Sequence, residues 1–102
     1  SGEILDNSFL LRFYTFMEIS FLKKQAQLAL EIIQNTILEL LKKNPDGLRN
    51  SEISRQLGLE SMHQGAQKDY LVYSILGQLL DQKLIEKTTG KPTLYKIIKR
   101  TN

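Results

Sequence analysis

Hydrophobic residues recur three and four positions apart between Lys24 and Lys43, which is the spacing of one face of a helix. The members of this stripe are Ala26, Ala29, Leu30, Ile33, Ile37, Leu40 and Leu41. We predict an amphipathic helix over this range, ended by Pro45. Leu28 and Ile32 lie off the stripe, so we expect a second apolar face and a second packing partner for this helix.

The preceding segment, Phe9 to Leu22, is apolar on nearly every side. It holds five of the eight aromatic residues, namely Phe9, Phe13, Tyr14, Phe16 and Phe21. Helical spacing of the phenylalanines competes with a strand-like alternation over residues 18–21, and we predict a helix. A surface this apolar has to be covered, either by the core of its own domain, by a dimer contact, or by a neighbouring domain.

The stretch from Leu48 to Leu59 predicts a short helix that is followed by a sharp turn. Asn50 or Ser51 can cap the helix, and Glu52 places a carboxylate in its first turn. Ile53 and Leu57 are expected in the core, and Gly58 supplies the left-handed residue that ends the helix.

A second helix and a β-hairpin are predicted downstream. The helix is indicated by apolar residues that recur at helical spacing, namely Val72, Leu76, Leu79 and Leu80. Gly77 in its interior permits the close approach of another helix, most simply residues 24–43. Residues 83–88 and 93–98 alternate with a period of two and are predicted as strands, joined by a turn at 89–92.

This order of helix, turn, helix and hairpin resembles the winged helix-turn-helix superfamily over Leu48–Ile98, with Lys24–Lys43 as the usual first helix. Two features depart from that pattern. Glu60–Gln67 either makes a longer connection or extends the second helix at its start, and Lys83 stands where a glycine is usual. The resemblance implies that the second helix enters the major groove of duplex DNA while the hairpin, the wing, contacts the backbone.

The expected fold class is therefore mostly α with a small β-hairpin (α+β), a winged helix-turn-helix with an additional N-terminal apolar segment that we predict to be helical. We assign residues 1–22 to this aromatic segment and residues 23–102 to the DNA-binding domain.

A closer resemblance is carried by the pattern GxQKxYLxxSILGxLL. Its residues here are Gly65, Gln67, Lys68, Tyr70, Leu71, Ser74, Ile75, Leu76, Gly77, Leu79 and Leu80. The pattern is similar to winged-helix domains appended to some type II restriction endonucleases, which implies a parent protein that cuts DNA with a separate catalytic domain. A transcriptional regulator is the other parent that we consider. Ser1-Gly2 resembles a cleavage scar, so we treat the chain as a fragment.

Composition narrows the function classes. A chain of 102 residues supports one modest core, and the absence of cysteine excludes disulfides and thiolate metal sites. No apolar run approaches the roughly 20 residues of a membrane span, and we expect a cytoplasmic protein with no membrane partner. The net charge is +3, and basic residues concentrate in residues 82–102 while residues 1–22 are slightly acidic. This distribution favours phosphate contacts by the hairpin and tail.

The candidate DNA contacts fall into three groups. Arg49 and Arg55 flank the first helix of the motif as phosphate contacts, and the loop residue His63 could reach a phosphate. The other two groups are the exposed face near the start of the second helix (Gln67, Lys68, Tyr70, Tyr73 and Ser74) and the hairpin lysines (Lys87, Lys91 and Lys96). Tyr70 and Tyr73 could equally be half-buried core residues. Asp69 is explained more simply as a carboxylate at a helix N-terminus.

No active site, cofactor or metal is expected in this chain, and whether the parent protein is an enzyme stays open. Pro45-Asp46 with Asp81-Gln82-Lys83 spells the PD…(D/E)xK string of metal-dependent nucleases, but we expect Asp46 in a turn and Asp81 at a helix end, away from neighbouring strands. His63 lacks the partners that a metal site needs.

The alternative function is a protein–protein interaction module on a winged-helix scaffold. Exposed hydrophobic residues on the helix containing Tyr70–Gln78 would favour that alternative. A continuous positive surface from Arg49 to Lys91 would favour DNA. Homodimerisation through the aromatic segment, or packing of that segment on a catalytic domain, completes the expected partners.

Overall fold

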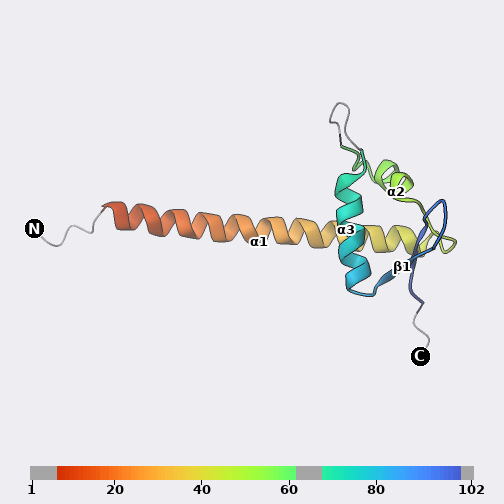
Figure 1. Ribbon diagram of the computed structural model, residues 1–102. Helices are drawn as coiled ribbons and strands as arrows, with labels where there is room; N and C mark the ends of the chain where they lie inside the picture. Colours follow the sequence, from red (N-terminus) through yellow and green to blue (C-terminus); the bar gives the residue numbers. More distant parts are fainter. Residues whose placement is uncertain (1–6, 62–67, 100–102) are drawn as a thin grey trace, which may run out of the picture. The chain divides into compact units, whose positions relative to one another are not determined.

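The computed structural model describes residues 7–61 and 68–99. Its elements are α1 (Asn7–Lys42), α2 (Asn50–Gln56), α3 (Tyr70–Asp81), β1 (Ile85–Lys87) and β2 (Tyr95–Ile97), as Figure 1 shows. The described chain is mostly helical with one small antiparallel hairpin, which confirms the α+β class. It divides into unit 1 (Ser1–Ile33) and unit 2 (Gln34–Asn102), described in turn below. The predicted contacts His63 and Gln67 lie outside the described residues.

Unit 1 is the N-terminal part of α1. The helix predicted for the aromatic segment is confirmed, and the predicted boundary at residue 22 lies inside α1. No glycine or proline interrupts residues 3–43, so the chain contains no helix breaker there. None of the side chains from Asn7 to Ile33 is buried.

Unit 2 contains the core. Its buried hydrophobic residues are Ile37, Leu41, Leu48, Ile53, Val72, Ile75, Leu76, Leu79, Ile85 and Tyr95. Full burial of each such aliphatic side chain contributes about 1.5–3 kcal/mol, so this set is the main source of stability. The predicted core positions Val72, Leu76 and Leu79 are confirmed, Ile75 joins them, and Leu57 and Leu80 are only partly covered.

The end of α1 is fixed by local hydrogen bonds. Asn44 Nδ2 donates to the carbonyl oxygen of Leu40 at 2.9 Å, and the amide of Gly47 donates to Asn44 at 2.8 Å. Gly47 has φ +97°, which only glycine adopts readily. The predicted turn after α1 is therefore present. About two turns before the end of α1, Gln34 Nε2 donates a hydrogen bond to Gln78 Oε1 of α3 at 2.8 Å.

The start of α2 differs from the prediction. The N-cap residue is Arg49, not Asn50 or Ser51. The amide of Arg49 donates to Glu52 Oε1 at 2.9 Å, which is the half of a capping box that the glutamate at the third helical position supplies. The end of α2 agrees with the prediction, because Gly58 has φ +67° and the amide of Leu59 donates to Ser54 at 2.8 Å.

The hairpin pairs Ile85 with Ile97, Glu86 with Lys96, and Lys87 with Tyr95. Its strands are shorter than the predicted ranges. Lys83, at the position where the pattern usually has glycine, takes φ +60° and so adopts the left-handed conformation itself.

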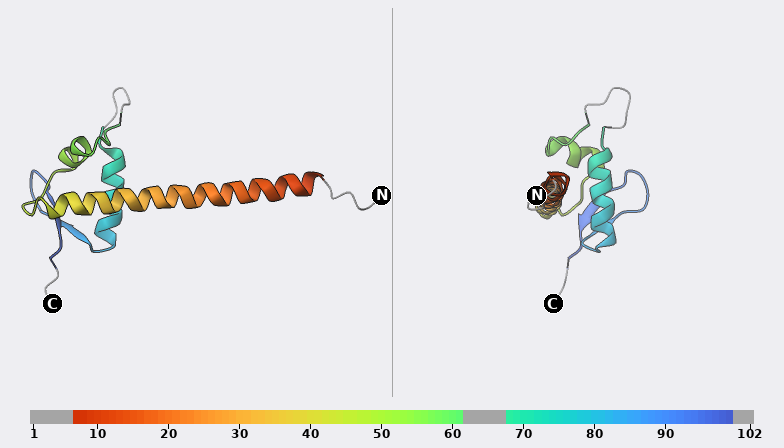
Figure 2. Two further views of the ribbon diagram at one scale, coloured as in Figure 1. Left: turned by 180° about the vertical axis from the view of Figure 1, so that it is seen from behind. Right: turned by 90° about the vertical axis from the view of Figure 1, so that its left-hand side faces the viewer.

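Leu48, in the segment before α2, adds one pairing position to β2. Its amide donates to the Tyr95 carbonyl at 3.1 Å, and the Tyr95 amide donates back to Leu48 at 2.8 Å. Both residues are buried, so the bridge links the chain before α2 to the core side of the hairpin. Figure 2 gives two further views of α2, α3 and the hairpin.

Candidate nucleic-acid interface

The first hollow of unit 2 surrounds the N-terminus of α3, and we call it the α2–α3 hollow. It is open, has a volume of about 540 Å³, and is lined by Asn50, Lys68, Asp69, Tyr70 and Tyr73. Asn50 Nδ2 donates to the Asp69 carbonyl at 3.4 Å, which ties the start of α2 to the start of α3. Three of the predicted DNA contacts therefore share one surface.

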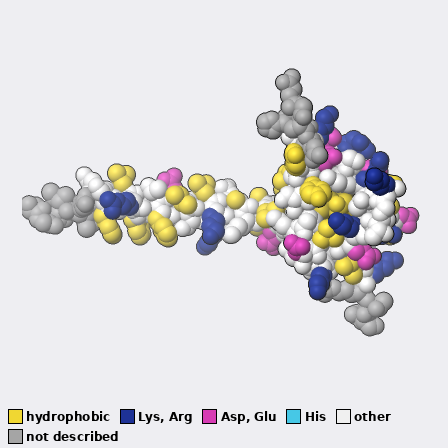
Figure 3. Space-filling view, in the orientation of Figure 1, with side chains coloured by type: hydrophobic (Ala, Val, Ile, Leu, Met, Phe, Trp, Pro, Cys, Tyr) yellow, Lys and Arg dark blue, Asp and Glu magenta, His cyan; other side chains and the backbone are white. Residues whose placement is uncertain are grey.

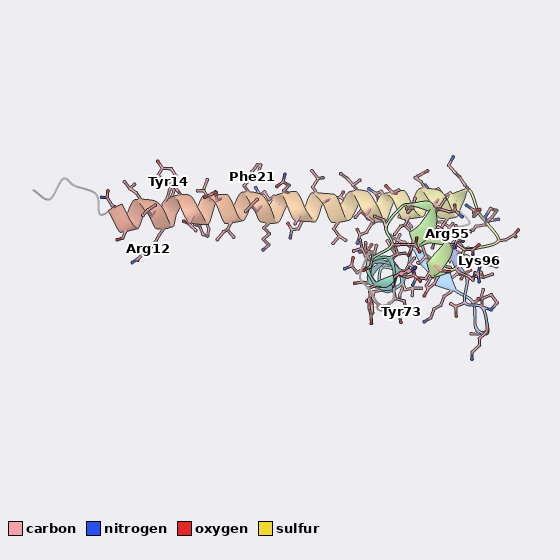
Figure 4. The ribbon with its side chains drawn as sticks, turned by 90° about the horizontal axis from the view of Figure 1, so that it is seen from above. Arg12, Tyr14, Phe21, Arg55, Tyr73 and Lys96 are labelled. Carbon is pink, nitrogen blue, oxygen red and sulfur yellow. The ribbon has the colours of Figure 1, made fainter. Side chains whose placement is uncertain are left out.

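The second hollow lies between α3 and the hairpin, and we call it the α3–hairpin hollow. Its volume is about 210 Å³, and its lining residues are Tyr73, Gly77, Leu80, Asp81, Lys87 and Tyr95. Tyr73 borders both hollows and is 60% exposed. Viewed from above, it lies on the side of α3 turned away from the last turns of α1 (Figure 4). Tyr73 thus connects the helix surface to the hairpin surface.

Burial raises the pKa of the Tyr95 hydroxyl above its usual range, and the neighbouring Tyr73 raises it further. An unperturbed tyrosine has a pKa of about 10, so Tyr95 keeps its proton at neutral pH. A protonated hydroxyl can donate a hydrogen bond to a phosphate oxygen. The α3–hairpin hollow therefore combines two tyrosines with the ammonium group of Lys87.

The hairpin lysines do not share one surface. Lys87 pairs with Tyr95, whereas Lys96 pairs with Glu86 at the next position. Side chains alternate between the two faces of a strand pair, so Lys87 and Lys96 point to opposite faces. Lys96 borders a separate hollow lined by Pro45, Glu86, Lys96, Ile97, Ile98 and Lys99. The structure separates Lys96 from the group formed by Tyr73 and Lys87.

The two predicted arginines occupy opposite ends of α2. Arg49 Nε lies 3.3 Å from Glu52 Oε1, and the side chains of both residues are partly exposed. The amide of Arg49 lowers the pKa of Glu52, and the side chains of Arg49 and Arg55 lower it further. Glu52 therefore offsets part of the positive charge at Arg49. Arg55, in the last turn of α2, is exposed (Figure 4).

The remaining described candidates are exposed but line neither hollow. They are Ser74, in the middle of α3, and Lys91, between the strands. Tyr70 is 59% exposed and Tyr73 60%, so neither is a half-buried core residue.

Exposed apolar surface also occurs on α3, because Leu71 is 46% exposed beside Tyr70. On the face of unit 2 that Figure 3 shows, Lys and Arg side chains are interspersed with Asp and Glu. The visible face is therefore mixed in charge.

Gly77 does not serve the close helix approach that its position suggested. A Cβ atom built at Gly77 meets no heavy atom within 4 Å. The neighbouring residue Gln78 contacts α1 instead, by accepting a hydrogen bond from Gln34. Gly77 opens onto the α3–hairpin hollow.

Asn50 and Tyr95 line the two hollows, although the sequence indicates no site role for them. The sequence indicates a helix cap at Asn50 and a strand position at Tyr95. Their positions depend on the α2–α3 packing and on the pairing of Lys87 with Tyr95, which alternation alone does not fix.

The nuclease-like string is dispersed, with Asp46 in the turn after α1 and Asp81 as the last residue of α3. Within the described ranges, no group of three or more His, Asp or Glu side chains is placed to hold a metal ion. Among the same residues, no helix has the length and apolar character to cross a membrane. Comparison of the chain with protein-family models, with curated proteins and with solved structures finds no match.

Proposed function

We propose that unit 2 is a winged helix-turn-helix that binds double-stranded DNA. In this proposal α3 lies in the major groove and the hairpin lies along the sugar–phosphate backbone. The observation that carries the proposal is the continuous arrangement of Lys68, Tyr70, Tyr73 and Lys87 along the two hollows. The Leu48–Tyr95 bridge supports it, because it holds the chain before α2 against the hairpin.

The two hollows suit different parts of a duplex. At the α2–α3 hollow, Lys68 can reach guanine acceptors or a phosphate, and the Asp69 carboxylate can accept from cytosine N4. The Asn50 amide there is bonded to the Asp69 carbonyl. At the α3–hairpin hollow, Lys87 and the tyrosine hydroxyls are donors for phosphate oxygens. The proposal therefore assigns sequence reading to the first hollow and backbone contact to the second.

The parent protein in this proposal is a restriction endonuclease or a transcriptional regulator. In the first case unit 1 packs on a catalytic domain, and in the second it forms a homodimer, as a palindromic site requires.

The test compares Lys87→Ala with Lys96→Ala in fluorescence anisotropy with a random-sequence duplex library. Both variants remove one lysine of β1 or β2, but the two lysines lie on opposite faces of the hairpin. We expect Lys87→Ala to weaken binding about tenfold, which is about 1.4 kcal/mol. We also expect the slope of log affinity against log salt to fall by about one for that variant.

Lys96→Ala is expected to retain nearly the full affinity and salt slope. Equal effects of the two variants would mean that the proposed orientation is wrong. If the chain without substitutions, called the parent chain from here on, binds no duplex at low salt, DNA binding by unit 2 is refuted.

Two observations favour the second candidate, a protein-interaction module. The visible face of unit 2 is mixed in charge rather than continuously positive (Figure 3), and α3 exposes apolar side chains. Leu71 and Tyr70 expose apolar surface on α3, and interface cores are enriched in tyrosine and aliphatic contact area. Leu71→Ala distinguishes the candidates, because it leaves DNA affinity unchanged if only the hollows bind the duplex. A protein partner that uses this surface would lose affinity.

A further inference from the structure

We infer that the α3–hairpin hollow receives one phosphodiester group of the DNA backbone, and that position 77 is glycine because the strand approaches the backbone of α3 there. This inference rests on the proposed function and assigns a specific contact to it.

The first step is that Gly77 has no reason within the described chain to be glycine. It lies in the interior of α3, where glycine is the least favourable residue apart from proline. The glycines with positive φ are Gly47, Gly58 and Gly90, so the conformation of Gly77 does not require glycine. Packing does not require it either, since an added Cβ meets nothing within 4 Å.

The second step is that glycine also occurs where a ligand approaches a backbone closely. The open side of Gly77 borders a hollow rather than flat surface. A methyl group there would take up space that no atom of the described protein fills. An external molecule in that space explains the glycine.

The third step is the chemistry around Gly77. Tyr73 lies one turn earlier on α3, and Lys87 and Tyr95 form a cross-strand pair on the hairpin. Tyrosine is protonated at neutral pH, so both hydroxyl groups can donate. An ammonium group with two hydroxyl donors matches the oxygens of a phosphate.

Asp81 defines the direction of approach. It lies one turn after Gly77, at the C-terminal end of α3, and its carboxylate repels phosphate. The phosphate therefore lies toward Tyr73 and Lys87, and the adjoining sugar passes over Gly77.

The experiment introduces side chains of increasing size, Gly77→Ala and Gly77→Leu, and measures both thermal unfolding and duplex affinity. We expect both variants to fold, with Gly77→Ala at least as heat-stable as the parent chain, because alanine favours the helix and finds open space. We expect duplex affinity to fall for Gly77→Ala and to fall at least tenfold for Gly77→Leu. A gain in stability with a loss of affinity is not expected of a residue with a purely structural role.

Leu71→Phe is the matched control, because it enlarges an exposed side chain of α3 that borders neither hollow. We expect it to keep the parent affinity. A double-mutant cycle between Gly77→Leu and Lys87→Ala provides a second readout. If both act on one phosphate, the effect of the pair is smaller than the product of the single effects.

Wild-type affinity of Gly77→Leu, in a parent chain that binds DNA, overturns this inference and leaves the proposed function intact. Independent effects in the double-mutant cycle also overturn it. Absence of duplex binding by the parent chain refutes both proposals.

Discussion

Gly47 and Lys83 both have positive φ angles, but only at Gly47 do the surroundings leave no room for a side chain. At Gly47, with φ +97°, an added Cβ would lie 2.9 Å from Lys96 Cγ and 3.1 Å from Leu94 Cβ. At Lys83, with φ +60°, a full side chain is accommodated and remains exposed. Gly47 therefore combines a conformational requirement with close packing against β2.

Gly47→Ala is expected to lower the free energy of unfolding by about 3 kcal/mol, from backbone strain and overpacking together. Urea denaturation followed by circular dichroism measures the change. Gly90→Ala is the matched control, since Gly90 has φ +105° but an added Cβ there meets nothing within 4 Å. The control retains the strain without the clash, so we expect a smaller loss. Equal losses would show that packing against β2 contributes nothing.

The sequence predicts a residue of the candidate site correctly where the only question is whether its side chain is exposed. Lys68, just before α3, is exposed as predicted, because the apolar stripe fixes which face of a helix is buried. For Tyr70 the sequence left a half-buried core position open, and the structure shows the side chain 59% exposed. Gly77 was misinterpreted, because a glycine in a helix leaves the same sequence signal whether a neighbouring helix or a ligand needs the space.

Among the elements, α2 depends most on its surroundings. It has seven residues, and isolated helices of that length are unstable in water. Its start relies on the hydrogen bond from the Arg49 amide to Glu52 Oε1 at 2.9 Å. The pKa of Glu52 is lowered, first by this bond and then by the arginine side chains. The charged form of Glu52 is therefore favoured by folding.

This coupling predicts an acid-dependent stability. A carboxyl group whose pKa is lower in the folded state stabilises the fold above its unfolded pKa of about 4.3, and the contribution is lost as the pH falls through the folded value. Glu52→Gln keeps a hydrogen-bond acceptor but does not titrate. We expect the stability difference between the parent chain and Glu52→Gln to be largest near neutral pH and to shrink in acid.

Urea denaturation at several pH values between neutrality and strong acid tests this prediction. Glu39→Gln is a control that removes a carboxylate from an exposed ion pair of α1, 3.0 Å from Lys42. A difference between the parent and Glu52→Gln that does not change with pH would contradict the assigned role of the Glu52 charge.

The sequence predicted the kind and order of the elements better than their ends. Periodicity identified the helices and the hairpin because burial imposes a period on whichever element is present. It did not identify Arg49 as a cap, because the acceptor there comes from Glu52, three residues later. The sequence also did not predict that α1 runs unbroken from Asn7 to Lys42. An all-round apolar segment has no single face from which to read a period.

At the scale of the whole molecule, unit 1 exposes an unusual amount of apolar surface. Between Phe9 and Leu22, nine large hydrophobic side chains are at least 50% exposed. Tyr14 and Phe21 point to one side of the helix and Arg12 to the other (Figure 4), and hydrophobic side chains cover much of the visible surface there (Figure 3). A helix that is apolar on all sides is stable in water only when it is covered.

We predict that a second copy of the chain covers this surface, because two identical helices supply equal apolar area. Sedimentation equilibrium is expected to give a dimer or a larger assembly. Phe13→Glu combined with Phe16→Glu is expected to shift the protein to the monomer, since charges in an apolar interface are strongly unfavourable. Tyr73→Glu, which changes an exposed residue of unit 2, is the control and should leave the assembly unchanged.

A parent chain that remains monomeric over the whole soluble concentration range would contradict the prediction. Packing of unit 1 on a separate domain would then be the remaining explanation. The sequence indicates that the apolar surface of unit 1 needs a packing partner but does not identify that partner. Composition gives the amount of apolar surface and not the shape of the partner that packs on it.

The Leu48–Tyr95 bridge has a mechanical consequence. The chain enters this bridge from the end of α1 and leaves it through β2, so α2, α3 and β1 form a loop that is closed by two hydrogen bonds. Tension applied between α1 and the C-terminal side of β2 would pass directly across the bridge. The α2–α3 hollow would remain outside the path of the force until those two bonds break, whereas the α3–hairpin hollow contains Tyr95 and so lies on that path.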